Sequence, residues 1–222
     1  MRFVMFLTLF TVFVTLTPLH PSTLNQGPGE NEFGLFAGAD LNLHSASFTQ
    51  LGSYASCCPE FSDGTGLGPY LGLFYTLPLS SSWKLQTRLT YVSSPYSSTY
   101  AEPSFVADLR DTPRVREAVF THQIDATIST LGLEPMIGYR PFGALDIFLG
   151  GSVSYVLSAH FTQTETLTEP SDYGEYLGDD RTWVNHDADI PGASSIRATA
   201  VALARYVIPL NKRGSTFLAP EV

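Results

Sequence analysis

The chain has 222 residues, a formal net charge of -9 and a sequence pI near 4.9. Phosphate binding needs a basic surface, so this acidic balance argues against nucleic acid as a partner. Charged residues make up only 15% of the chain, below the roughly 25% of a typical soluble domain, while the mean hydropathy of +0.06 is too low for a helical membrane protein.

Residues 1–20 are predicted to be a secretory signal peptide. Arg2 supplies a positive start, and the apolar run Phe3 to Leu16 that follows is 14 residues long. That is short for a spanning helix, which needs about 20 residues. The cleavage site is not marked by an A-x-A pattern, so an uncleaved anchor is the alternative. Residues 21–32 then form a polar periplasmic lead-in, and residues 33–222 form one domain.

Alternation of apolar and polar residues predicts β-strands through this domain. The clearest case is Trp83 to Val92, where apolar and aromatic residues alternate with Lys84, Gln86 and Arg88. Because successive side chains of a strand point to opposite faces, this strand has one apolar and one polar face. The predicted strands cover 33–48, 67–77, 83–92, 119–139, 145–161 and 193–208, and a seventh begins at Thr216.

Two of these stretches carry further information. Leu145 to Phe161 is much longer than the ~5–6 residues of an ordinary strand, and a tilted strand crosses a bilayer with about 9–11 residues. In 119–139 the apolar positions change from even to odd numbers near Ser129 and Thr130. One extra residue would flip the faces there, so we predict a β-bulge; the alternative is two separate strands.

The predicted connections alternate between long and short. The long ones are 49–66, 93–118 and 162–192, and the short ones are 78–82, 140–144 and 209–214. A short helix is expected within the second long connection, over 109–119. The first holds the adjacent pair Cys57 and Cys58, read as two loop thiols, a strained vicinal disulfide or a bond to a partner. Long outer loops opposite short periplasmic turns are typical of a membrane β-barrel.

With this architecture, and with local runs such as LGLEPMIGYRPFG at Leu131 to Gly143, the chain resembles the small outer-membrane β-barrel proteins of the OmpA/OmpX kind from Gram-negative bacteria. The resemblance implies an all-β, antiparallel, up-and-down transmembrane barrel of eight strands, with outer-membrane lipid, lipopolysaccharide and the barrel-assembly machinery as partners. The departure is that about seven strands are present and the chain ends in APEV instead of an aromatic residue. We therefore expect a sequence that is incomplete at its C-terminal end.

If the apolar faces meet lipid, the polar faces meet the barrel interior. An eight-stranded barrel has room for side chains but not for a wide channel, and buried charges should pair. A salt-bridged plug is therefore predicted, with a narrow ion path as the alternative. The residues expected in this interior charge network are Lys84, Arg88, Asp125, Glu134, Arg140, Asp146, Arg197, Arg205 and Glu221.

The expected function is that of a non-enzymatic structural or surface-binding barrel whose loops bind an extracellular ligand. No catalytic motif, cofactor motif or metal-binding spacing is found in the sequence. An enzyme stays open as an alternative, because His44, His122, His160 and His186 lie near loop ends. A secreted soluble β-sandwich is a further alternative.

Overall fold

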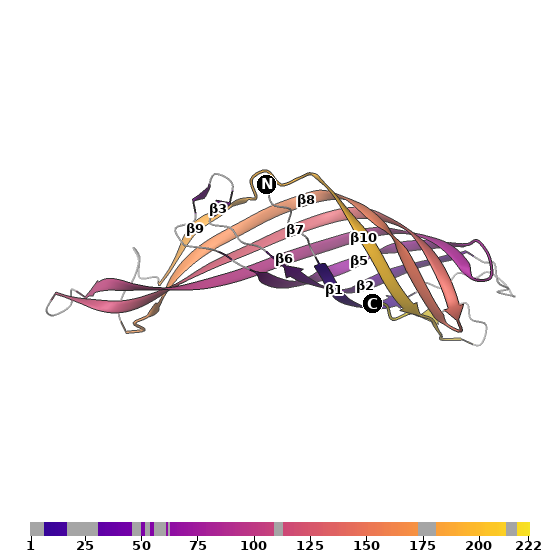
Figure 1. Ribbon diagram of the computed structural model, residues 1–222, viewed down its shortest axis with the longest axis horizontal. Coiled ribbons are helices and arrows are strands. Elements are labelled where there is room, and N and C mark those ends of the chain that lie inside the picture. Colours follow the sequence, from indigo (N-terminus) through magenta and orange to yellow (C-terminus); the bar gives the residue numbers. More distant parts are fainter. Residues whose placement is uncertain are drawn as a thin grey trace.

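The structure is a computed structural model that describes residues 7–16, 31–45, 50–51, 54–55, 61, 63–108, 113–172, 181–211 and 217–222. The chain is all-β (Figure 1). The strands are β1 (Leu7–Leu16), β2 (Glu32–His44), β3 (Gln50–Leu51), β4 (Tyr54–Ala55), β5 (Gly64–Pro78), β6 (Trp83–Asp108), β7 (Arg114–Phe142), β8 (Leu145–Glu169), β9 (Thr182–Asp189), β10 (Ile196–Tyr206), β11 (Ile208–Pro209) and β12 (Phe217–Leu218). The described residues contain no helix long and apolar enough to cross a membrane.

Ten strands form one antiparallel sheet in the order β10-β8-β7-β6-β5-β2-β1-β12-β11, with β9 paired to β8 beside β10. The succession from β2 to β8 is the predicted up-and-down meander. The sheet is not closed into a barrel: β12 meets β1 at the single pair Leu16 and Leu218. On the other side, backbone hydrogen bonds join Val222 to Ala204 of β10. The predicted seventh strand is thus represented by the segment 217–222.

Residues 7–16, predicted to belong to a signal peptide, form β1 beside β2. The pairing of these residues says nothing about whether they are cleaved off in the cell, so the signal peptide stays a prediction. The pair Cys57 and Cys58 lies outside the described residues.

Two predicted loops prove to be strands. β6 runs on through the stretch taken as a loop, to Asp108, and β7 begins at Arg114. The helix expected over 109–119 was therefore wrong in its described part, because Arg114 to Val119 pair with β6. β8 likewise continues to Glu169, and β9 pairs with it. These parts belong to the same ten-stranded sheet and are here called the extension, which includes the twisted ribbon at the left of Figure 1. The extension consists of residues 93–108 of β6, 114–129 of β7 and 158–169 of β8, together with β9.

The apolar side chains exchange faces where the meander passes into the extension. Near the start of β8, Leu149 is 58% exposed and Val153 is 60% exposed. Phe161, farther along the same strand, is fully buried. In β7, Leu133 is exposed but Ile124 is buried. Phe161 and Ile124 belong to a small core with Phe61. The meander therefore exposes an apolar stripe, while its inner face also buries aromatic residues such as Phe74 and Phe148. The extension buries Phe161 and Ile124 but exposes other apolar residues, among them Phe105 and Val115.

A register shift occurs between Ser129 and Thr130, where the β-bulge was predicted. The strand that holds the extra residue is different from the one expected. Ser129 pairs with Ser158 and Thr130 with Val156, so Leu157 of β8 is the additional residue. Even-numbered residues of β7, from Ile124 to Gly138, stay on the buried face on both sides of the shift. The apolar residues of β7 thus change from even to odd positions because they move from the inner to the outer face, and not because β7 contains a bulge.

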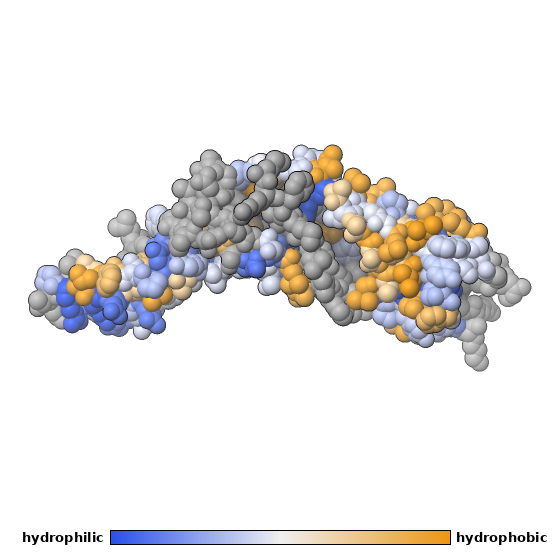
Figure 2. All heavy atoms as spheres, in the orientation of Figure 1, coloured by the Kyte–Doolittle hydropathy of each residue, from blue (hydrophilic) through white to orange (hydrophobic). Residues whose placement is uncertain are grey.

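Figure 2 shows the same division on one face of the molecule. Apolar residues gather over the half where β7, β8 and β10 approach the short turns, while the far end of the extension is mainly hydrophilic. On β6 the outward apolar positions run from Trp83 to Tyr91, a span of nine residues. That length matches the 9–11 residues with which a tilted strand crosses a bilayer. The outward apolar residues of the meander are called the apolar band below.

Candidate functional site

The inner face of the meander holds a cluster of ion pairs near the short turns. Lys84 on β6 contacts Glu32 on β2 at 2.9 Å and Asp146 on β8 at 3.1 Å. Arg205 on β10 bridges the same two carboxylates, at 3.1 Å to Glu32 and 2.9 Å to Asp146. Arg140, at the end of β7, donates to both oxygens of Asp146 at 2.6 and 2.9 Å. The buried carboxylate of Asp146 thereby joins its own strand β8 to β6, β7 and β10.

A second group lies deeper along the same face. The guanidinium of Arg88 donates to both carboxylate oxygens of Glu221 and lies 4.9 Å above the ring of Phe36. The hydroxyl of Tyr70 donates to Glu134 at 2.7 Å. These contacts join β2, β5, β6 and β7 to the last residues of the chain.

The guanidinium of Arg205 is packed between aromatic rings. Its central carbon lies 4.9 Å from the ring centroid of Phe148, 5.8 Å from Phe74 and 5.9 Å from Phe217. Its Nε and Nη1 atoms have no hydrogen-bond partner in the structure. A cation over aromatic faces gains electrostatic attraction from the rings, which partly offsets the loss of these hydrogen bonds. The side chains of this region form a hydrophobic core around the charges, with Phe36, Phe74 and Phe148 among its members.

The charges of the two groups balance. The network contains four basic residues, Lys84, Arg88, Arg140 and Arg205. It also contains four acidic residues, Glu32, Glu134, Asp146 and Glu221. A buried charge without a counterion is costly, and pairing within one shared network reduces that cost.

Seven of the nine residues predicted for the interior network therefore lie in it, and two do not. Asp125 is exposed on the outside of the extension and accepts a hydrogen bond from Gln123. It was placed inside on the assumption that the apolar residues beside it face outward, but in the extension those residues face inward. Arg197 is half-buried on β10 and interacts electrostatically with Asp40, away from the main network.

Sequence reasoning missed two members of the network. Glu32 had been assigned to the lead-in, although its even number places it on the same face as Phe36 and Asp40 of β2. Tyr70 was read only as part of β5, yet it follows the same alternation as the buried Phe74. Extending the first predicted strand by one residue would have found Glu32, and reading the even-numbered face of 67–77 would have found Tyr70.

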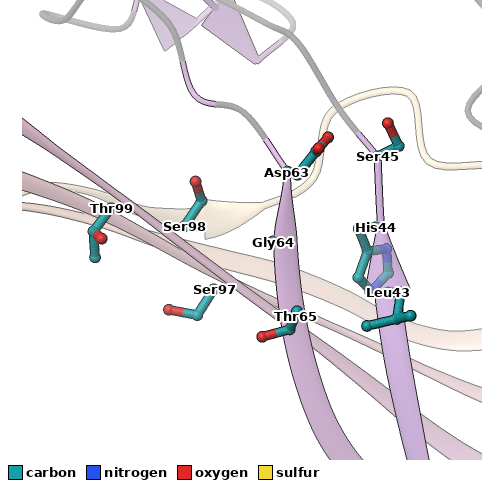
Figure 3. A pocket seen from close by; sticks show the side chains of 9 residues that line it. All are labelled: Leu43, His44, Ser45, Asp63, Gly64, Thr65, Ser97, Ser98 and Thr99. Atoms are coloured by element: carbon teal, nitrogen blue, oxygen red, sulfur yellow. The ribbon is translucent and has the colours of Figure 1, made fainter.

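A pocket of about 490 Å³ lies at the other end of the meander, where β2 and β5 end and β6 runs on into the extension (Figure 3). This pocket is called the fork pocket. β5 makes its last pair with β6 at Thr65 and Ser97, and β2 ends beside it at His44. The lining residues are Leu43, His44, Ser45, Asp63, Gly64, Thr65, Ser97, Ser98 and Thr99.

The histidines considered for catalysis contact carboxylates and a carbonyl group. His44 Nε2 lies 3.3 Å from the carbonyl oxygen of Pro95. His122 lies between Glu102 at 3.2 Å and Glu165 at 3.5 Å, joining three strands of the extension. His160 contacts Asp187 of β9 at 2.6 Å. Among the described residues, no group of three or more His, Cys, Asp or Glu side chains is arranged to hold a metal ion.

No protein-family model, curated protein or solved structure matches this chain.

Proposed function

We propose that this chain is a non-enzymatic β-barrel protein of the outer membrane of a Gram-negative bacterium. Its meander would span the membrane around a plugged, charge-paired interior, and its extension would stand outside the cell as a binding surface. The short turns would then lie on the periplasmic side. The observation that carries the proposal is the exchange of faces along β7 and β8.

In water, an apolar side chain is stabilised by burial and a charged one by exposure. In the extension Phe161 and Ile124 are buried as that rule requires, while Phe105 and Val115 at its far end are exposed. The meander does the reverse: Leu149 and Val153 face outward, while Arg88 is 1% exposed. A strand whose apolar face reverses partway along fits a chain that passes from hydrocarbon into water. A soluble β-sandwich would need a second layer over Leu149 and Val153, and among the described residues none covers them.

The packed interior supports a plug over a pore. An eight-stranded barrel is wide enough for side chains to fill it, and here the ion pairs and the aromatic rings around Arg205 occupy the inner face. The role left for the protein is structural support or surface binding by the extension, since loops and projections on a rigid scaffold commonly carry recognition.

The test is a pair of lysine substitutions in refolded protein. Leu149→Lys places a cation in the apolar band, where it should cost about 2–4 kcal/mol near the bilayer midplane and prevent insertion into lipid vesicles. Val184→Lys places the same charge at an exposed position of β9 and should be tolerated. Insertion is read from the gel mobility of unboiled samples, since folded barrels resist detergent until boiled. Equal insertion of both variants would overturn the proposal.

A further inference from the structure

The far end of the extension exposes apolar side chains on one face. Among the described strands, β6 and β7 form a two-stranded ribbon at this end, since β8 makes its last pair with β7 at Val119 and Glu169. Directly opposite residues of an antiparallel pair lie on the same face of the sheet. The residues on the exposed face of the ribbon, here called the tip face, are Pro103, Phe105, Ala107, Val115, Glu117 and Val119.

These apolar side chains are unusually exposed for residues that stand in water. Val115 is 72% exposed and Phe105 is 68% exposed, and Figure 2 shows apolar atoms among the hydrophilic ones at this end of the molecule. They lie at the opposite end of β6 from Trp83, so the hydrocarbon that would surround the apolar band does not reach them. Grouped apolar side chains on a water-exposed surface commonly mark an interaction site, because burial stabilises them.

Two charges of opposite sign lie at this end of the ribbon. Glu117 is exposed opposite Phe105, and its side chain makes no ion pair or hydrogen bond with the part of the chain that the structure describes. Arg114, three residues earlier on β7, is 65% exposed in its side chain and contacts Asp108 at 3.2 Å. A facing anionic membrane would be repelled by Glu117, and a wholly apolar surface would bury this carboxylate without a counterion, which is costly.

We propose that the tip face binds a second copy of this chain, head to head. If the β7 strands of the two copies lie antiparallel across a two-fold axis, the contact is reciprocal, and Glu117 of each copy lies beside Arg114 of the other. The axis then passes between positions 115 and 116, so the two Val115 side chains pack together. Phe105, which is opposite Glu117, lies near the same arginine. This arrangement gives each Glu117 a counterion and buries apolar residues of both copies.

The contact is small, and its geometry determines what it joins. The tip face spans two strands, so it falls short of the roughly 800 Å² per partner of a standard interface, and we expect weak, concentration-dependent association. Head-to-head ribbons point their two meanders in opposite directions. The last step rests on the proposed function: with each meander in a membrane, the two copies lie in facing membranes, where many weak contacts act together.

The experiment traps the contact as a disulfide in full-length refolded protein in detergent micelles, with Cys57 and Cys58 both replaced by Ser. Val115→Cys places a thiol next to the two-fold axis, and oxidation by copper phenanthroline should convert this variant to a covalent dimer. Val119→Cys is the matched control on the same face of β7. It should give little dimer, because a disulfide needs Cα atoms within about 7 Å of each other. Yields are corrected for the rate at which each thiol reacts with a small labelling reagent.

Charge reversal tests the reciprocal pairing in the Val115→Cys background. Glu117→Arg alone, or Arg114→Glu alone, should slow trapping about fivefold or more, because like charges then face each other across the axis. A mixture of these two variants should trap as fast as the parent, since each copy then meets opposite charges.

Three results would overturn the proposal. They are equal corrected yields from Val115→Cys and Val119→Cys, no dimer from either, and a mixture of the charge variants that traps no faster than each variant alone. The trap works without a membrane, so its failure leaves the lysine insertion test unaffected, and failure of insertion leaves the trap readable.

Discussion

Arg88 and Glu221 are 133 positions apart in the chain, yet Nη2 of Arg88 donates to both carboxylate oxygens of Glu221, at 2.9 and 2.8 Å. Both side chains are almost completely buried. Through this pair, β6 in the middle of the meander holds the C-terminal segment, whose backbone is hydrogen-bonded to β10. The contact therefore fixes the end of the chain against the inner face.

Loss of one partner of this pair should be more damaging than loss of both. Arg88→Met or Glu221→Met alone leaves an unpaired buried charge and should lower the free energy of unfolding by about 3–5 kcal/mol. The double variant Arg88→Met with Glu221→Met should recover most of that loss. Urea unfolding in detergent, followed by gel mobility, measures all three. A double variant as unstable as the sum of the single variants would mean that the two charges are not coupled.

Close packing between β5 and β6 should make Gly72 intolerant of a methyl group. A Cβ there would lie 2.0 Å from the carbonyl oxygen of Leu89, a backbone atom that moves only with its strand. Gly72→Ala should cost about 1–3 kcal/mol, the range for overpacking. Gly151→Ala is the control, because its Cβ would meet nothing closer than 3.4 Å. Similar unfolding midpoints for the two variants would contradict the pairing of β5 with β6.

Arg205 should be the residue that keeps the interior closed to ions. Its guanidinium is fully buried between aromatic rings and two carboxylates. Arg205→Ala should therefore produce small single-channel currents in planar bilayers, where the parent protein should give none. Arg181→Ala is the matched control, since Arg181 binds backbone carbonyls in the extension. Stepwise currents from the parent protein would instead favour the narrow pore.

The docking of β9 onto β8 should weaken as the pH rises. The hydrogen bond to Asp187 raises the pKa of His160 above its usual 6.5, and Asp189 adds to this effect. A raised pKa means that the charged imidazole stabilises the folded form. That contribution is complete below pH 6.5 and is lost as the pH rises through the raised pKa. Amide exchange of β9, corrected for intrinsic rates, should be faster at pH 8.5 than at pH 5.5. His160→Gln should remove the difference, and a parent protein with equal protection at both values would contradict the assignment.

The apolar period allowed the meander to be predicted because outward-facing apolar residues and inward-facing residues alternate there. Trp83 to Thr90 shows this well: each outward residue there is followed by one that proves buried. The same alternation located most of the charge network, including the distant pair Arg88 and Glu221. Glu32 was missed because the strand was started one residue too late.

The extension could not be predicted in the same way. Ser93 to Phe105 is rich in Ser, Tyr and Pro, and both faces of such a strand tolerate water, so no apolar period marks it. Its conformation depends on pairing with β7, for example Thr99 with Gln123. That pairing is a long-range contact that local sequence does not report. Asp125 was placed on the wrong face for a related reason, since the sequence does not show where the apolar residues of β7 pass from the outer face to the inner one.

The two tryptophans give the most direct test of whether the apolar band meets hydrocarbon. The chain has two tryptophans, and their exposure is nearly equal: Trp83 in the band is 46% exposed and Trp183 in the extension is 48% exposed. Single-tryptophan variants, Trp183→Phe and Trp83→Phe, would be refolded into vesicles of brominated lipid, whose bromine atoms quench fluorescence only at short range. The account predicts strong quenching of Trp83 and little of Trp183. Equal quenching of both, or none of either in inserted protein, would contradict it.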